Sequence, residues 1–401
     1  LRAMPGGLRA NTFASRTIMS LPVVAAEIVL ALAAGLLARD LFGRRAGHVA
    51  AAACWLLPPL AMDTSLWGQT DAWPLAPAML AVWLLLRRSW AGAGACLGLA
   101  ATLKPQAVLM APVVLFAAAV VPADEPRRAP ALRFARRVLL AAGAGAAVVA
   151  LLAAPWTAAD GLAWLRESYV ENLRRYSQTT LMAFNVWYLD LLRLDARPIL
   201  AAADAGATVL GLTKDAWGRL LLLTSGAALA WACWRRLRSC AGVAVAAFGA
   251  LWLWSAFLWP TRVHDRYVVF CIPLLAVCAA GLRRLWPALA AVALLAAAET
   301  SYTAWLPLPY AGHFNESMMH EHRELLARAY HEAGIDAEPT VEDAVRASWP
   351  AYQRARRAAR PWEHALSILS IAAYAAAMAL TLTARLPQTP SLDRQRRGDY
   401  R

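Results

Sequence analysis

The sequence is short of charged residues. Only 16% of its 401 residues are Asp, Glu, Lys or Arg, whereas 60% are hydrophobic. A soluble domain carries about 25% charged residues, so this chain has too few to cover a surface that faces water. The short alternating strands of a membrane β-barrel are also missing. The apolar runs are roughly 15–20 residues long and predict an all-α fold, a polytopic transmembrane helical bundle of about eleven spans.

Lysine is scarce as well, and the cysteines show no pattern typical of metal binding. Lys104 and Lys214 are the only lysines among 40 basic residues, so arginine clusters between apolar runs carry most of the net charge of +14. Such clusters orient spans toward the cytoplasm and contact anionic lipid, which favours membrane lipids and no nucleic acid as partners. The six cysteines lack ligand spacing, and His320 and His322 would face different sides of a helix. We therefore predict no metal site and no cofactor, since a divalent metal is not indicated.

The positions of the apolar runs predict how the chain is organised. With the arginine clusters in the cytoplasm, every second loop lies on the outer face, and the polar loops meet there. Because the chain begins with Leu1, we expect an upstream helix and outer loop to precede it. The expected parts are an outer-loop remnant (1–21), a transmembrane core (22–300), an outer polar segment (301–363), a last span (364–384) and a cytoplasmic basic tail (385–401).

The first outer cluster combines Asp63, Trp67, Gln69, Asp71 and Trp73 at the end of a short apolar run. Ionisable groups at membrane depth are costly and usually functional. The tryptophans can stack on a sugar ring, and the amide and carboxylates can bind its hydroxyls. An ordinary interfacial turn with tryptophan anchors is the alternative.

The second outer cluster is Lys104-Pro105-Gln106, between two apolar runs. Proline interrupts the helix, and a lysine at such a break can hold a phosphate as a point charge. The alternative is a snorkelling lysine at a helical hairpin.

The third outer cluster packs several ionisable residues into the run 262–267. Arg266 suits a phosphate, and His264 can serve as hydrogen-bond donor or acid. Asp265 and Tyr267 complete the candidate binding residues, and a plain charged loop is the alternative.

A fourth cluster, with Asn185 and Trp187, closes the long outer stretch. An amide beside aromatic rings suits a sugar site, but interfacial packing explains these residues equally well.

Together these runs resemble motifs of the GT-C superfamily of membrane glycosyltransferases. Residues 67–71 (WGQTD) resemble the W-G-Q-x-D run of bacterial members, 104–106 their K-P-Q, and 184–187 (FNVW) their N-x-W segment. Residues 263–266 (VHDR) are similar to the V-H-E-K run of the endoplasmic-reticulum glucosyltransferases that use dolichyl-phosphate glucose, with both charges kept. The four motifs occur in the family's order, and the resemblance covers about residues 20–300.

This resemblance implies a GT-C-like enzyme in the bacterial inner membrane. It would transfer a hexose, mannose or glucose, with inversion from a polyprenyl-phosphate sugar to a lipid or glycan acceptor on the outer face. The family's general base is an Asp in the first outer loop, and no acidic residue precedes Glu27 in the matching run. That base would then lie upstream, which leaves Asp71 and His264 as catalytic candidates and the other named cluster residues as substrate-binding. A transporter or flippase of lipid-linked sugar and a non-catalytic membrane subunit are the alternatives.

Overall fold

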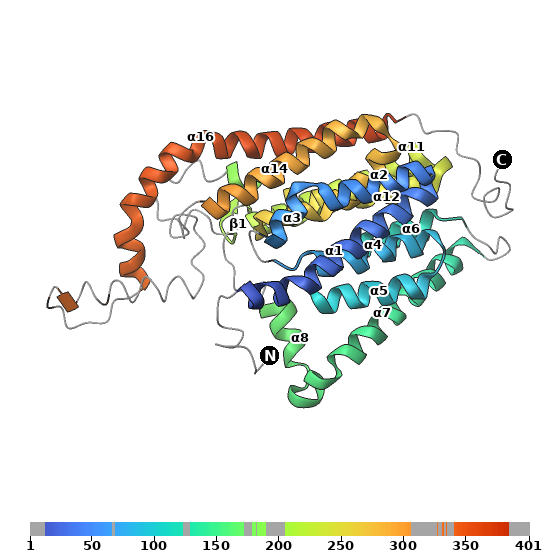
Figure 1. The fold of residues 1–401 in the computed structure, drawn as a ribbon, viewed down its shortest axis with the longest axis horizontal. Coiled ribbons are helices and arrows are strands. Elements are labelled where there is room, and N and C mark those ends of the chain that lie inside the picture. The colour runs from blue at the N-terminus through green and yellow to red at the C-terminus, as the bar shows by residue number, and fades with distance from the viewer. Residues whose placement is uncertain are drawn as a thin grey trace.

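The computed structural model is an all-α bundle in which long helices run side by side (Figure 1). Within the described residues, strand is limited to four two-residue segments, β1 (Thr180–Leu181), β2 (Thr208–Val209), β3 (Leu212–Thr213) and β4 (Val263–His264). The structure describes residues 13–65, 69–122, 129–171, 179–181, 183–189, 205–305, 327, 331–332, 334 and 341–384.

The helices follow the apolar runs of the sequence in order. The N-terminal half contains α1 (Phe13–Phe42), α2 (Arg44–Leu56), α3 (Pro58–Ser65), α4 (Ala72–Leu86), α5 (Trp90–Leu103), η2 (Pro105–Met110), α6 (Ala111–Val120), α7 (Pro130–Asp160), α8 (Ala163–Arg166) and η3 (Glu167–Glu171). The C-terminal half contains α11 (Lys214–Leu237), η5 (Arg238–Cys240), α12 (Ala241–Leu258), η6 (Asp265–Cys271), α13 (Ile272–Gly281), η7 (Arg283–Leu285), α14 (Trp286–Trp305) and α16 (Val341–Leu382).

Five of the described helices are long and apolar enough to cross a membrane. They are Ser20–Phe42, Pro130–Asp160, Lys214–Leu237, Ala241–Leu258 and Trp362–Leu382. Three further apolar helices of 10–17 residues, Ala72–Leu86, Trp90–Leu103 and Pro105–Val120, are shorter. At 1.5 Å per residue these reach roughly 15–26 Å, less than the ~30 Å hydrocarbon core of a bilayer. The described helices therefore indicate a membrane protein, with fewer full-length spans than the eleven expected.

Two prolines lie inside helices rather than at their ends. Pro22 lies within α1, which is described from Phe13 onward. Pro155 lies within α7, which continues to Asp160. Helices in membranes tolerate proline because neighbouring groups satisfy the freed backbone carbonyl. The first residues of the expected outer segment 301–363 belong to α14, and its last residues belong to α16. The expected tail 385–401 lies outside the described residues.

Helix α12 is the centre of the bundle, and the outer helices expose apolar side chains. Every α12 residue from Val243 to Leu258 is buried, as is typical of a helix that is apolar on all sides. By contrast, Leu139 and Leu151 of α7 are 70% and 74% exposed, and Leu223 of α11 is 65% exposed. An apolar exterior around a packed centre suits a protein whose solvent is lipid.

Helices α5 and α7 approach each other unusually closely. A Cβ atom on Gly94 would lie 1.9 Å from the carbonyl oxygen of Ala141, and one on Gly98 would lie 2.4 Å from that of Gly145. No side chain fits in these spaces. Small residues at such crossings let membrane helices pack backbone to backbone.

The buried seam of α16 is largely polar, whereas its outward face is apolar. The buried polar residues of this seam are Glu363, Ser367, Ser370 and Thr381. Tyr374 lies on the same seam, and its hydroxyl forms a 2.7 Å hydrogen bond with the hydroxyl of Ser255 in α12. The spacing of four, three and four residues along the seam keeps these side chains on one helix face. Hydrogen bonds of this kind hold helices together in membranes, and Figure 1 shows this part of α16 lying along α14.

Candidate functional site

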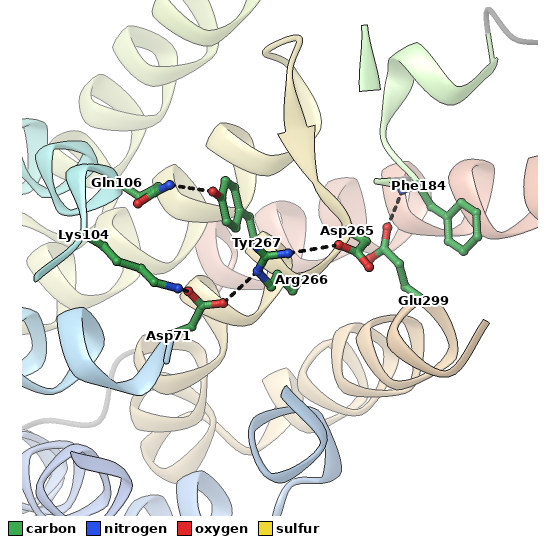
Figure 2. Close-up of polar contacts among 8 residues, drawn as sticks. All are labelled: Asp71, Lys104, Gln106, Phe184, Asp265, Arg266, Tyr267 and Glu299. Atoms are coloured by element: carbon green, nitrogen blue, oxygen red, sulfur yellow. Dashed lines mark hydrogen bonds and ion pairs between the residues drawn. The ribbon is translucent and has the colours of Figure 1, made fainter. Parts of the chain in front are cut away.

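Residues from the polar clusters of the sequence lie close together in the structure, as Figure 2 shows. They come from the segment before α4, the break between α5 and η2, the turn after α12 and the end of α14. The parallel pairing of β1 with β4 brings the segment around residue 180 to the same place. Residues far apart in the chain therefore form one buried polar centre.

The core of this centre is one carboxylate between two cations. Asp71 is fully buried, and its carboxylate forms a hydrogen-bonded ion pair with the ammonium group of Lys104. The other carboxylate oxygen of Asp71 lies 3.3 Å from Nε of Arg266, at an angle that is not that of a hydrogen bond. The Lys104 and Arg266 side chains are 19% and 18% exposed. Both positive charges are thus mostly removed from solvent and balanced here by a shared carboxylate.

Local backbone geometry explains why these side chains point inward. Proline disfavours helical geometry in the residue before it, and Lys104, which precedes Pro105, is extended at φ −150° and ψ 134°. Helix α5 therefore ends at Leu103, and the lysine turns away from the helix axis. Asp71 directly precedes α4 but makes no capping hydrogen bond with its side chain, so its carboxylate is available to the cations.

Aromatic and amide groups line the same centre. The Gln106 amide nitrogen donates a 2.6 Å hydrogen bond to the Tyr267 hydroxyl. The Arg266 guanidinium lies 5.5 Å from the centre of the Tyr267 ring, and the His264 ring lies edge-on to the same ring at 5.3 Å. Tyr267 thus connects the residues predicted to bind a phosphate with the histidine predicted to be catalytic.

A further carboxylate, Glu299, joins the centre from α14. It is 2% exposed and accepts a hydrogen bond from the backbone N–H of Phe184. Asp265, whose charge acts on Glu299, lies 3.8 Å from the Arg266 guanidinium. Glu299 was not among the site residues predicted from the sequence, although its place directly after an apolar run is a usable signal.

Asn185 and Trp187 donate hydrogen bonds to backbone carbonyls around the end of α12. The Asn185 amide nitrogen lies 3.3 Å and 3.4 Å from the carbonyl oxygens of Phe257 and Pro260, to which it donates. The Trp187 indole N–H donates a 2.6 Å hydrogen bond to the Trp259 carbonyl oxygen. These contacts satisfy carbonyls in the last turn of α12 and in the two residues that follow it, so both side chains have a structural role. That they bind sugar stays a prediction.

Asp63, in α3 and outside the candidate spans, is the second carboxyl beside Asp71. It is 2% exposed, and among the described residues no donor reaches its Oδ1 atom. Burial, followed by the nearby Asp71 carboxylate, raises the pKa of Asp63 to about 8, although Arg266 and Lys104 act in the opposite direction. Asp63 is therefore able to hold a proton near neutral pH.

The remaining predicted residues lie at the edge of the centre or outside the described residues. The backbone N–H of Gln69 donates a 3.0 Å hydrogen bond to the carbonyl oxygen of Asp63 in α3. Trp73 is half-buried in the first turn of α4. Trp67, His320 and His322 lie outside the described residues.

Chemically, two partly buried cations in an apolar bundle suit an anion that arrives with an apolar tail. Lysine and arginine bind phosphate through charge-assisted hydrogen bonds, and low solvent exposure strengthens such contacts. The chain matched no protein-family model, and no curated protein matched it. The geometry and the motifs therefore carry the functional argument.

Proposed function

We propose that the protein is a membrane glycosyltransferase of the GT-C type, which moves a hexose from a polyprenyl-phosphate sugar to a lipid or glycan acceptor. The reaction would take place at the outer face of a bacterial inner membrane. In this proposal the short apolar helices combine with the long ones into a multi-pass topology of about eleven spans. The observation that carries the proposal is the convergence of Asp71, Lys104 and Arg266, from three separate segments, into one buried centre.

In the proposed reaction the acceptor hydroxyl oxygen attacks the anomeric carbon of the hexose. The bond between that carbon and the phosphate oxygen breaks, and the polyprenyl phosphate leaves with the bonding electron pair. The acceptor proton passes to a general base, for which His264 and the carboxylates of the centre are the candidates. Inversion at the anomeric carbon follows because attack and departure occur on opposite faces.

Lys104 and Arg266 would stabilise the leaving group. Negative charge grows on the phosphate as the glycosidic bond breaks, and fixed cations in a site of low exposure stabilise that charge without reorganising. Asp71 would hold the two cations in place before the donor arrives. Gln69 and Trp73 border the centre and would contact the sugar or the acceptor.

Donor binding by the purified protein in lipid nanodiscs tests this assignment. A charge-assisted hydrogen bond contributes about 1.5–3 kcal/mol, so Lys104→Ala and Arg266→Ala should each weaken binding of polyprenyl-phosphate mannose or glucose by roughly 10- to 150-fold. Arg87→Ala is the matched control, because Arg87 follows α4 at the end away from Asp71 and pairs there with Asp40. Unchanged donor affinity in both variants would remove Lys104 and Arg266 from the phosphate site.

A further inference from the structure

The buried centre contains more acid than base. Asp63, Asp71, Asp265 and Glu299 supply four carboxyls, all at most 3% exposed. If all four were ionised, the two cations of the centre would leave two excess negative charges. Such a centre would repel a phosphate, because charges in a poorly solvated site interact strongly.

Asp63 is one carboxyl of this centre that is well placed to lose its charge. Both oxygens of Asp71 face a cation, and Glu299 already accepts a hydrogen bond from the Phe184 N–H. By contrast, no donor among the described residues reaches Oδ1 of Asp63. A buried carboxylate oxygen without a donor is costly, and protonation removes that cost.

We propose that the anion site formed by Lys104 and Arg266 takes up a proton on Asp63 when it binds a phosphate diester. The proton comes from solvent and converts the Asp63 carboxylate into a neutral carboxylic acid. With Asp63 neutral, the excess of negative charge in the centre falls from two to one, so Lys104 and Arg266 attract the incoming phosphate against a weaker repulsion. This inference rests on the proposed binding of a phosphate by Lys104 and Arg266. It does not depend on the proposed transfer of a sugar.

The charged groups around Asp63 support this direction of coupling. Helix α3 packs against α1, α2, α14 and η6. Among the charged groups that act on Asp63, the Asp71 carboxylate opposes a negative charge there. The cations Lys104 and Arg266 favour a negative Asp63 in the empty site, but a bound phosphate would engage both of them. Binding therefore raises the pKa of Asp63 beyond its value of about 8 in the empty site.

Affinity for a phosphodiester should consequently depend on pH with a defined sign. Below about pH 7 the empty site already holds the proton, so the affinity is constant. Above pH 8 each bound ligand must bring a proton with it, and the affinity should fall by up to tenfold per pH unit. A diester is the right probe because, unlike a phosphate monoester with its second pKa near 6, it keeps one charge throughout this range.

The experiment measures binding of farnesyl-phosphoryl-mannose and farnesyl-phosphoryl-glucose to the full chain in nanodiscs from pH 6.5 to 9. Calorimetry in two buffers of different protonation enthalpy should report uptake approaching one proton per bound ligand at pH 8.5 and little uptake at pH 6.5. Asp63→Asn, a neutral isostere of the protonated acid, should bind equally at all pH values. Asp40→Asn, in α1 beside Arg87 at the far end of α4, should keep the wild-type pH dependence.

Binding by the wild-type protein that is independent of pH, without proton uptake, would overturn the inference while leaving the phosphate site intact. Unchanged pH dependence in a folded Asp63→Asn variant would overturn the assignment to Asp63. The wild-type titration and calorimetry need no variant, so the inference can fail even if Asp63→Asn does not fold. Absence of binding at every pH would overturn the phosphate site itself, and with it the proposed function.

Discussion

Substituting Asp71 by Asn should destabilise the protein strongly, and a bound anion should restore part of the loss. Asp71 is fully buried and pairs with both Lys104 and Arg266, whose side chains are less than one-fifth exposed. Removing one partner of a buried ion pair costs about 3–5 kcal/mol, because a charge is left without compensation. In Asp71→Asn two cations lose their shared carboxylate, so we expect a loss at the upper end of that range.

The assay is unfolding of the purified protein in detergent, followed by intrinsic tryptophan fluorescence, with and without a prenyl phosphodiester. The ligand should stabilise Asp71→Asn more than wild type, since its phosphate replaces the missing carboxylate. Glu171→Gln is the control, because the exposed ion pair between Glu171 and Arg166 should contribute no more than about 1 kcal/mol. If Asp71→Asn were as stable as Glu171→Gln, the two cations would not depend on this carboxylate, and the description of the centre would be refuted.

Three further substitutions test the packing that supports the site. Gly94→Leu should cost at least about 1–3 kcal/mol of stability through overpacking against α7, whereas Gly143→Leu, where the added Cβ meets nothing within 4 Å, should leave the melting temperature nearly unchanged. Asn185→Ala should leave two helix-end carbonyls without a donor and cost about 1–3 kcal/mol, which unfolding in detergent measures; equal stability would show that solvent replaces the amide. Ser255→Ala should leave the Tyr374 hydroxyl without its 2.7 Å partner and lower stability by about 1 kcal/mol, and Tyr374→Phe in the same background should recover most of it.

Much of the helical order was predictable from the sequence, because apolar runs and arginine clusters mark where helices begin and end in a membrane. The apolar run 75–86 of the sequence lies within α4 (Ala72–Leu86), and the break at Pro105 separates α5 from η2. The number of spans was harder to predict. Short helices such as α6 (Ala111–Val120) do not cross a bilayer alone, and prolines such as Pro155 do not end the helices that contain them.

Part of the candidate site was also predictable, because its residues are ionisable and lie at the ends of apolar runs. Asp71, Lys104 and Arg266 were all named from sequence, and the structure brings them together. The contacts of Glu299 were not predictable, since its partner, the Phe184 N–H, is a backbone group more than a hundred positions away. The packing of Asn185 against the end of α12 depends in the same way on tertiary structure, and Trp67 lies outside the described residues.

Sugar transfer by the full-length protein in membrane vesicles tests the central claim most directly. Vesicles would be given radiolabelled polyprenyl-phosphate mannose or glucose, with folding checked by unfolding in detergent. The account predicts that label moves from one donor to a lipid or glycan, and that Lys104→Ala and Arg266→Ala each slow this transfer by at least tenfold. Absence of transfer from either donor by folded protein, or movement of intact donor across the membrane instead, would contradict the assignment as a glycosyltransferase.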